Sequence, residues 1–324
     1  MKKIIPWLVI AIAIRLLVAS VTLHPDLRAY ARASYLISQE GMVFNFYDAN
    51  LGGLSNDILN YPPIAYLSTA PFMTILSSFY PWDLFQTLLH DFDKVYGDPQ
   101  LPLLLFLLKS PYIIFDLVGL LLIGQLFREH KKRFWAQIVW LFNPITIYTS
   151  YMMGQSDLLI ALFILLAIVM AAKKKYLWAA VSLGVGGGVK LFPLLLIPFL
   201  VLQGGKTLGE RLKIFAVAIG TFLAIISPYL PSVGFRQYAL VASQTDKMLF
   251  AKIPVSGAEF LPIFVVLFGL LIWLCFQKPD RIALWQWFLI VLLSFFGLTH
   301  YHPQWFVWTV PLLILLVVSD ATRK

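Results

Sequence analysis

Apolar runs that approach the length of a membrane span alternate along the chain with short basic or proline-containing segments. A spanning helix needs about 20 mainly apolar residues. The runs of this kind are residues 4–23, 110–127, 135–151, 157–172, 176–190, 191–204, 213–230, 257–276, 282–299 and 304–319. The pattern predicts an all-α polytopic membrane protein with about ten transmembrane helices.

One further apolar stretch, residues 61–80, is long enough to span but is interrupted by Pro62, Pro63 and Pro71. Proline removes a backbone donor and clashes with the preceding helical turn. The stretch therefore either crosses the membrane, lies in the interface, or enters and leaves on the same side.

The basic residues decide between these possibilities, because Lys and Arg concentrate in cytoplasmic loops. If residues 61–80 do not cross, six basic clusters fall on one side, with 16 of the 25 Lys and Arg residues there. The clusters are Lys2 and Lys3; Arg128, Lys131, Lys132 and Arg133; Lys173 to Lys175; Lys206, Arg211 and Lys213; Lys278 and Arg281; and Arg323 and Lys324. We therefore predict cytoplasmic termini, a re-entrant or interfacial segment at 61–80, and an external loop at 24–109.

The external loop is expected to contain helices of its own. Residues 26–39 place most of their apolar side chains near one face, which is typical of a helix lying on the membrane surface. Pro25 disfavours helix before this segment, and Asp26 is suited to cap its first turn. Residues 81–92 have the same amphipathic character.

Composition supports a single integral membrane domain over residues 1–324. Apolar residues make up 60% of the chain and charged residues 13%, with a mean hydropathy of +0.81, whereas a soluble domain has about 25% charged residues. The first run follows basic residues as a signal peptide does, but it contains Arg15 and no cleavage site follows. We expect a retained helix. The net charge of +9 is explained by the inner loops, so nucleic acid is not an expected partner.

Polar residues gather at one predicted face, the external one. They are Asp26, Tyr61, Lys109, Gln155, Asp157, Lys190, His300, His302 and Gln304. Ionisable groups at or inside the hydrocarbon are costly and persist mainly where they have a function. The pattern predicts a site at the external membrane face.

Simpler roles are open for several of these residues. Asp157 is placed to cap a helix, Lys190 to extend its ammonium to the interface, and the pair His300 and His302 to anchor the chain beside Trp305. In mid-helix, Asp116 is expected to stabilise a partner helix or to pair with Arg15 rather than to take part in chemistry.

Other kinds of site have little support in the sequence. The HxH pair lacks the further ligands that zinc requires, so no metal is expected. GVGGGVK (184–190) lacks the spacing of a phosphate-binding loop, and no cofactor is expected.

Five segments, in order along the chain, carry most of these polar residues. They are HPDLRAY (24–30), NYPPIAY (60–66), FNPITIYTSYMMGQSDLL (142–159), GVKLFPLLLIPF (188–199) and THYHPQWFVWTVP (299–311). In these segments the chain resembles the GT-C superfamily of polytopic glycosyltransferases, which use polyprenyl-phosphate sugars. NYPPIAY is similar to a DYPPLxAY segment of the dolichol-linked glucosyltransferase branch, with Asn60 in place of Asp. The mannosyltransferase branches are similar as well.

The resemblance implies a glycosyltransferase that moves a hexose, with mannose or glucose favoured, by an inverting, metal-independent mechanism. The donor would be a polyprenyl-phosphate sugar, the acceptor a lipid-linked or cell-envelope glycan, and the location the plasma membrane. Asp26 would act as the base, with Asp48 and Asp57 as alternatives. Lys190 and His302 would stabilise the departing phosphate. The other expected substrate-binding residues are Arg28, Tyr61, Lys109, Gln155, Asp157, His300 and Gln304.

Two other functions remain open from the sequence. Transporters and lipid flippases also place polar residues on broken helices, although their sites usually lie near the midplane and their chains often contain inverted repeats. A non-catalytic subunit that binds a polyprenyl lipid would need the same apolar grooves and polar face.

Overall fold

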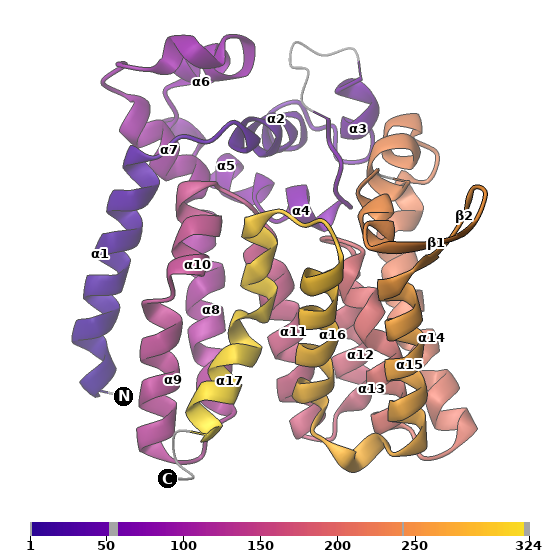
Figure 1. Cartoon of the computed structure of the whole chain (residues 1–324). Coiled ribbons are helices and arrows are strands. Elements are labelled where there is room, and N and C mark those ends of the chain that lie inside the picture. Colours follow the sequence, from indigo (N-terminus) through magenta and orange to yellow (C-terminus); the bar gives the residue numbers. More distant parts are fainter. Residues whose placement is uncertain (1, 52–57, 242, 321–324) are drawn as a thin grey trace.

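The computed structural model describes residues 2–51, 58–241 and 243–320 and is 76% helical. The helices stand side by side in an upright bundle, and shorter helices cover one end of it (Figure 1). The bundle helices are α1 (Ile5–Val21), α7 (Leu101–Lys109), α8 (Pro111–Gln125), α9 (His130–Leu141), α11 (Asp157–Ala172), α12 (Tyr176–Gly187), α13 (Ile197–Gly204), α14 (Leu208–Ile226), α15 (Ile263–Gln277), α16 (Leu284–Leu298) and α17 (Val310–Asp320). This architecture agrees with the predicted all-α class.

Short helical segments join the bundle helices or extend their ends. They are η1 (Lys2–Ile4), α10 (Pro144–Thr146), η4 (Ile147–Met152), η5 (Phe192–Leu196), η6 (Ser227–Tyr229), η7 (Phe235–Leu240), η8 (Ser243–Leu249), η9 (Pro279–Arg281) and η10 (Pro303–Thr309). Two of them, η4 and η7, are π-helices, a form that often occurs near functional sites.

Among the described residues, two helices, Leu101–Gln125 and Leu208–Tyr229, are long and apolar enough to cross a membrane. Residues Ile5–Val21 and Asp26–Ser38 pass the same test as a pair but are bent by 92° at their junction. Seven further apolar helices are shorter: Ile64–Ile75, Asp157–Ala172, Tyr176–Gly187, Phe192–Gly204, Ile263–Gln277, Leu284–Leu298 and Pro303–Ser319. The chain is therefore a membrane protein, and the number of ten spans stays a prediction.

The covering layer is built from the segment predicted as the external loop. Its elements are α2 (Asp26–Ser38), α3 (Phe46–Ala49), α4 (Ile64–Leu67), α5 (Ala70–Ile75), η2 (Ser77–Phe79), α6 (Trp82–His90) and η3 (Phe92–Val95). The segments predicted as amphipathic form the helices α2 and α6, which bury apolar side chains, and their position on the membrane surface stays a prediction. The helix Ile64–Ile75 is too short to cross the bilayer alone. The end of the predicted loop, residues 101–109, forms α7, which continues into α8.

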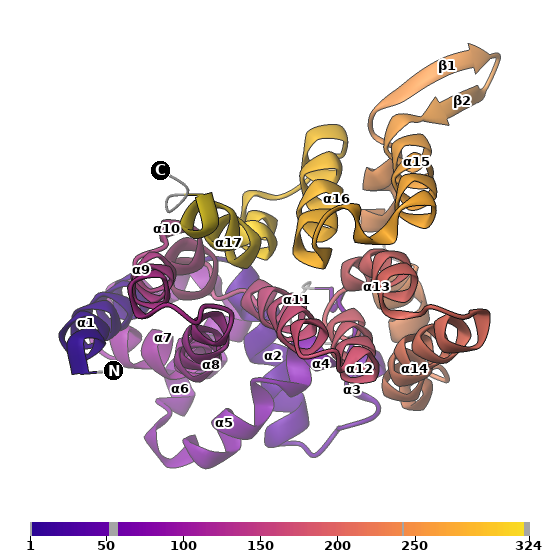
Figure 2. The same ribbon diagram turned by 90° about the horizontal axis from the view of Figure 1, so that it is seen from below.

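Residues 257–262 depart from the predicted span 257–276. They belong to a hairpin of β1 (Lys252–Ser256) and β2 (Glu259–Pro262) that projects from the side of the bundle, as seen from below in Figure 2. Gly257 has a φ of +51°, which favours a turn. Pro262 disfavours continuation of α15 toward the turn, because residues before proline prefer extended backbone. The helix therefore begins at Ile263.

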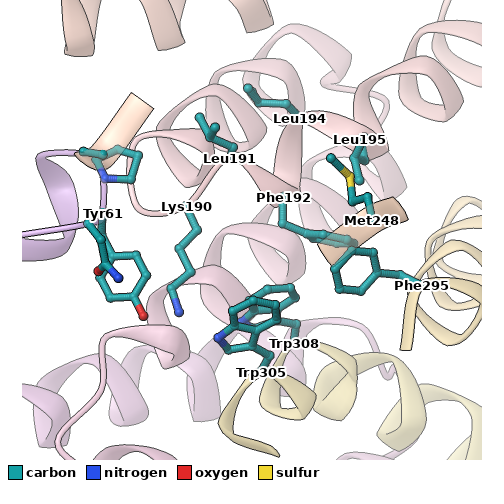
Figure 3. A pocket seen from close by; sticks show the side chains of 13 residues that line it. Tyr61, Lys190, Leu191, Phe192, Leu194, Leu195, Met248, Phe295, Trp305 and Trp308 are labelled. Carbon is teal, nitrogen blue, oxygen red and sulfur yellow. The ribbon is translucent and has the colours of Figure 1, made fainter. Parts of the chain in front are cut away.

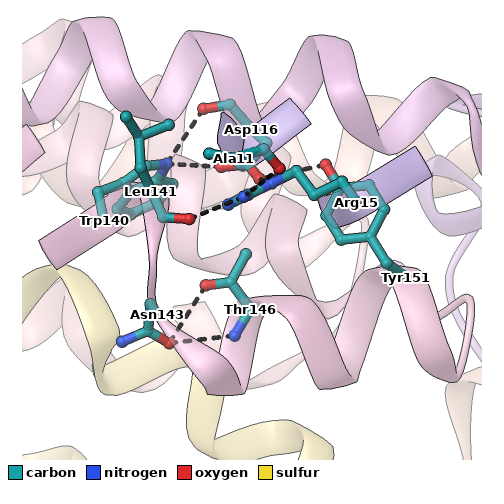
Figure 4. Close-up of polar contacts among 8 residues, drawn as sticks. All are labelled: Ala11, Arg15, Asp116, Trp140, Leu141, Asn143, Thr146 and Tyr151. Atoms are coloured by element: carbon teal, nitrogen blue, oxygen red, sulfur yellow. Dashed lines mark hydrogen bonds and ion pairs between the residues drawn. The ribbon is translucent and has the colours of Figure 1, made fainter. Parts of the chain in front are cut away.

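Arg15 and Asp116 form the predicted pair between α1 and α8 (Figure 4). Arg15 Nε lies 2.6 Å from Asp116 Oδ2, and both side chains are buried. Trp140 donates its indole N–H to Asp116 Oδ1 at 2.6 Å, and Tyr151 donates its hydroxyl to Oδ2 at 3.1 Å. Because the buried carboxylate has three donors, this cluster stabilises the packing of α1, α8, α9 and η4.

Close packing of α12 on α14 positions the segment that carries Lys190. A Cβ added at Gly184 would lie 2.5 Å from the backbone oxygen of Ala218, so only glycine permits this approach. Small residues at membrane helix interfaces allow such close contact. The sequence run GVGGG thus has a packing role.

Candidate functional site

A cavity of about 300 Å³ lies between three elements: η5, which follows α12 in the chain, α16 and η10 (Figure 3). Its wall is mainly apolar, and polar groups enter it from Tyr61 and Lys190. The apolar lining includes Leu191, Phe192, Leu194, Leu195, Met248 and Phe295. Ligand sites typically combine such an apolar wall with a few fixed polar groups.

Lys190 is paired with Asp157 rather than extended to the interface. Its Nζ lies 2.7 and 2.9 Å from the two carboxylate oxygens of Asp157. Asp157 is fully buried and Lys190 is 5% exposed. As the first residue of α11, Asp157 is also stabilised by the positive end of the helix dipole.

Aromatic rings surround the Lys190 ammonium. Its Nζ is 4.2 Å from the ring centre of Tyr61, 5.3 Å from that of Trp305 and 5.8 Å from that of Trp308. Trp308 also donates its indole N–H to Asp157 Oδ1 at 2.8 Å. Cation–π contacts of this kind gain strength where water is excluded.

The loop before α11 connects this ion pair to α2. Gly154 has a φ of +73°, and a Cβ there would lie 2.6 Å from Leu27 Cδ1, so glycine is required. Gln155 donates through Nε2 to Asp26 Oδ2 and accepts the Tyr30 hydroxyl at 3.1 Å on Oε1. Tyr30 therefore fixes the amide that holds Asp26.

Asp26 is the first residue of α2, where Pro25 occupies the cap position without a side-chain capping bond. Its carboxylate is 43% exposed and lies 3.8 Å from His24 Nδ1. The structure thus brings Asp26, Gln155, Asp157, Lys190 and Tyr61 together at the covered end of the bundle.

Lys109 lies at the ends of two bundle helices. The Lys109 side chain is fully buried, and its three N–H donors are shared among five acceptors within hydrogen-bonding distance: the backbone oxygens of Ala19, Thr22, Tyr151 and Met152 and the Thr22 hydroxyl. These contacts satisfy backbone carbonyl groups at the C-terminal ends of α1 and η4, so the role of Lys109 in the structure is to stabilise these helix ends. The guanidinium of Arg28 lies 5.8 Å from the ring centre of Phe92.

The segment before α17 carries two exposed imidazoles, one of which lies beside Trp305. The ring centre of His302 lies 5.4 Å from that of Trp305, whereas His300 contacts Phe250. Gln304 is buried, and its backbone oxygen accepts the Thr149 hydroxyl at 3.2 Å.

Lys247 also lies near Trp305, although the sequence did not indicate it as a site residue. Its Nζ lies 4.8 Å from the ring centre of Trp305. Burial, followed by repulsion from Lys190, lowers the pKa of Lys247. Burial also lowers the pKa of His302, with further lowering by Lys247 and Lys190. Lys247 is one of several basic residues in polar loops, and only the fold brings it to Trp305.

Asp57 lies outside the described residues. Asp48 lies within them and accepts hydrogen bonds from Ser232 and the backbone of Gly234 at 2.9 and 2.8 Å, so it joins α3 to the segment before η7. Within the described ranges, no group of three His, Cys, Asp or Glu residues is placed to hold a metal ion.

A family model described as PIG-U, GPI transamidase subunit PIG-U, matches residues 9–309. The match covers nearly the whole chain, including all the site residues described above. No curated protein matches the chain.

This match corrects the functional interpretation of the sequence. Membership of the GT-C superfamily, glycosyltransferase activity, and the polyprenyl-phosphate-sugar donor with its glycan acceptor are wrong, because the matched family is that of a transamidase subunit. The five segments that carried the resemblance place polar residues at one membrane face. Such a placement does not by itself specify a reaction. In particular, the Lys190 charge expected at a donor phosphate is neutralised by Asp157.

Proposed function

The chain belongs to the PIG-U family, and from this premise we propose that it is a non-catalytic membrane subunit of a GPI transamidase complex. GPI denotes glycosylphosphatidylinositol, a glycolipid. In this role the chain holds the lipid part of the substrate, and the peptide chemistry takes place on another subunit. Its partners are the other subunits and the lipid substrate.

The cavity is the observation that carries the proposal. It is about 300 Å³ in volume and mainly apolar, which suits a hydrocarbon chain. The polar groups of its lining, from Tyr61 and Lys190, lie at the same covered end of the bundle as Asp26 and Gln155. A lipid bound in this way would keep its chain among apolar side chains and its headgroup near the covered end of the bundle.

The proposed orientation follows from the basic clusters. The start of α1 and the end of α17 lie at the end of the bundle opposite to α2 and α6 (Figure 1). We propose ten spans, with both of these ends on the basic, cytoplasmic side and the cavity toward the opposite face. We place the chain in the membrane that holds the transamidase complex. This location corrects the plasma membrane that was expected from the sequence.

Binding of a single-chain lipid tests the proposal. Ala239 is buried and lines the cavity, so Ala239→Phe should fill part of it. Ala216 on α14 is exposed on the bundle surface, and Ala216→Phe is the matched control. Native mass spectrometry with lysophosphatidylinositol should show bound lipid in the wild type and the control but little in Ala239→Phe. Equal occupancy in all three proteins would contradict the proposal.

A further inference from the structure

Trp305 carries a buried indole N–H that has no hydrogen-bond partner among the described residues. The side chain is 4% exposed. Trp308, stacked on it with ring centres 5.4 Å apart, donates its own N–H to Asp157. A buried donor without a partner is costly. Because Trp305 lines the cavity (Figure 3), a ligand that presents an acceptor oxygen there would remove this cost.

The same ring faces a second ammonium group, for which the described part of the chain provides no counter-charge. Lys247 Nζ is 4.8 Å from the Trp305 ring centre, and no described carboxylate lies within ion-pair distance of it. Lys190 faces the ring as well, at 5.3 Å, but its charge is matched by Asp157. The uncompensated positive charge beside Trp305 therefore comes from Lys247.

The short helix η8 also contributes to the apolar wall. Met248 follows Lys247 and lines the cavity together with Leu194 and Leu195. A cation and an apolar wall are thus adjacent in space. This juxtaposition suits an amphiphile whose charged end lies at Lys247 and whose chain enters the cavity.

We propose that the Trp305 indole N–H and the Lys247 ammonium together bind an oxyanion, the phosphoryl group of a lipid whose chain fills the cavity. This inference rests on the proposed function and adds the headgroup class. A phosphoryl oxygen accepts the indole proton, and its negative charge makes the bond to Lys247 charge-assisted. A neutral ester would provide the acceptor without the charge, and a cationic headgroup would be repelled.

Three probes separate the headgroup from the chain: lysophosphatidic acid, the monoacylglycerol with the same chain, and inorganic phosphate. The variants are Trp305→Phe, which removes the N–H, and Lys247→Gln, which removes the charge. Lys252→Gln on the exposed strand β1 is the matched control for charge. Equilibrium binding to the full-length protein in detergent provides the measurement, with thermal unfolding to verify the fold of each variant.

The wild type should bind lysophosphatidic acid at least about tenfold more tightly than monoacylglycerol, and each variant should lose about tenfold for the phospholipid alone. Inorganic phosphate should bind far more weakly than either lipid. Unchanged phospholipid affinity in either Trp305→Phe or Lys247→Gln would overturn the inference, as would an equal loss for monoacylglycerol. Loss of all lipid binding in Ala239→Phe, with Trp305→Phe silent, would retain the proposed function and reject this headgroup site. Unchanged lipid affinity in Ala239→Phe, with the other variants weakened, would show that the lipid chain does not bind in the cavity.

Discussion

Lys190 Nζ contacts both carboxylate oxygens of Asp157, at 2.7 and 2.9 Å, in a position almost closed to solvent. The pair connects the first turn of α11 to the end of α12, two helices that pack along each other. Lys190 and Asp157 therefore stabilise each other first, and any charge available to a ligand must come from elsewhere.

Breaking this pair should strongly destabilise the protein. Lys190→Met and Asp157→Leu each leave an uncompensated buried charge and should each lower the free energy of unfolding by about 3–5 kcal/mol. The double variant should recover a large part of that loss, because it buries no lone charge. Denaturant unfolding in detergent measures all three. A double variant that loses the sum of the two single losses would show that the residues act independently.

Breaking the buried pair of Arg15 and Asp116, between α1 and α8, should also destabilise the protein. Asp116→Leu leaves the Arg15 guanidinium buried without its carboxylate and removes the acceptor of Trp140, so we expect a loss of about 3–5 kcal/mol. Glu129→Gln removes the exposed partner of Lys132 in an ion pair near the surface and should change stability by less than about 1 kcal/mol. Similar unfolding curves for the two variants would contradict the structural role of Asp116.

The orientation of the bundle can be tested by cysteine labelling in a Cys275→Ser background, because Cys275 is the single native cysteine. Lys131→Cys lies in a basic cluster, and Glu40→Cys lies exposed after α2. An impermeant thiol reagent applied to the non-cytoplasmic face of sealed membranes should label position 40 and not 131. Labelling of position 131 under these conditions would reverse the proposed topology.

Binding of the phospholipid should become tighter as the pH falls. In the free protein the pKa of His302 is lowered by burial and by Lys247 and Lys190, with an opposing effect of Asp26 and a smaller lowering by His300. A bound anion favours protonated His302, so the pKa of His302 is higher in the complex. Affinity then increases as the pH falls through the pKa of the complex and is constant above it.

Titration of lysophosphatidylinositol binding between pH 5 and 8 measures this effect, because its phosphodiester keeps a single negative charge over that range, and His302→Gln should remove it. A wild-type profile that is flat, or that strengthens as the pH rises, would place the anion away from His302.

Much of the scaffold follows from sequence periodicity. The helices at 26–39 and 81–92 were predictable because their apolar side chains share one face, and the Arg15–Asp116 pair because an isolated buried charge is costly. The hairpin at 252–262 was not predicted, since its apolar residues resemble the start of a span. Its turn depends on the positive φ of Gly257.

The site was only partly accessible from the sequence. The alternation of apolar runs places Asp26, Gln155 and Lys190 at one end of the bundle, as the structure does. The bidentate contact of Lys190 with Asp157 depends on distances that no motif specifies. Lys247 and the unpaired N–H of Trp305 likewise depend on how η8 folds against η10. The reaction was interpreted wrongly because shared placement of polar groups does not determine chemistry.

The most direct test of a lipid-holding, non-catalytic role is the steady-state kinetics of the assembled transamidase complex. Complexes that contain this chain as wild type, Ala239→Phe or Ala216→Phe would be compared over a range of lipid-substrate concentrations. We predict that Ala239→Phe raises KM for the lipid substrate about tenfold or more with kcat unchanged, and that Ala216→Phe has no effect. A fall in kcat at unchanged KM, or no change in either constant, would contradict the account.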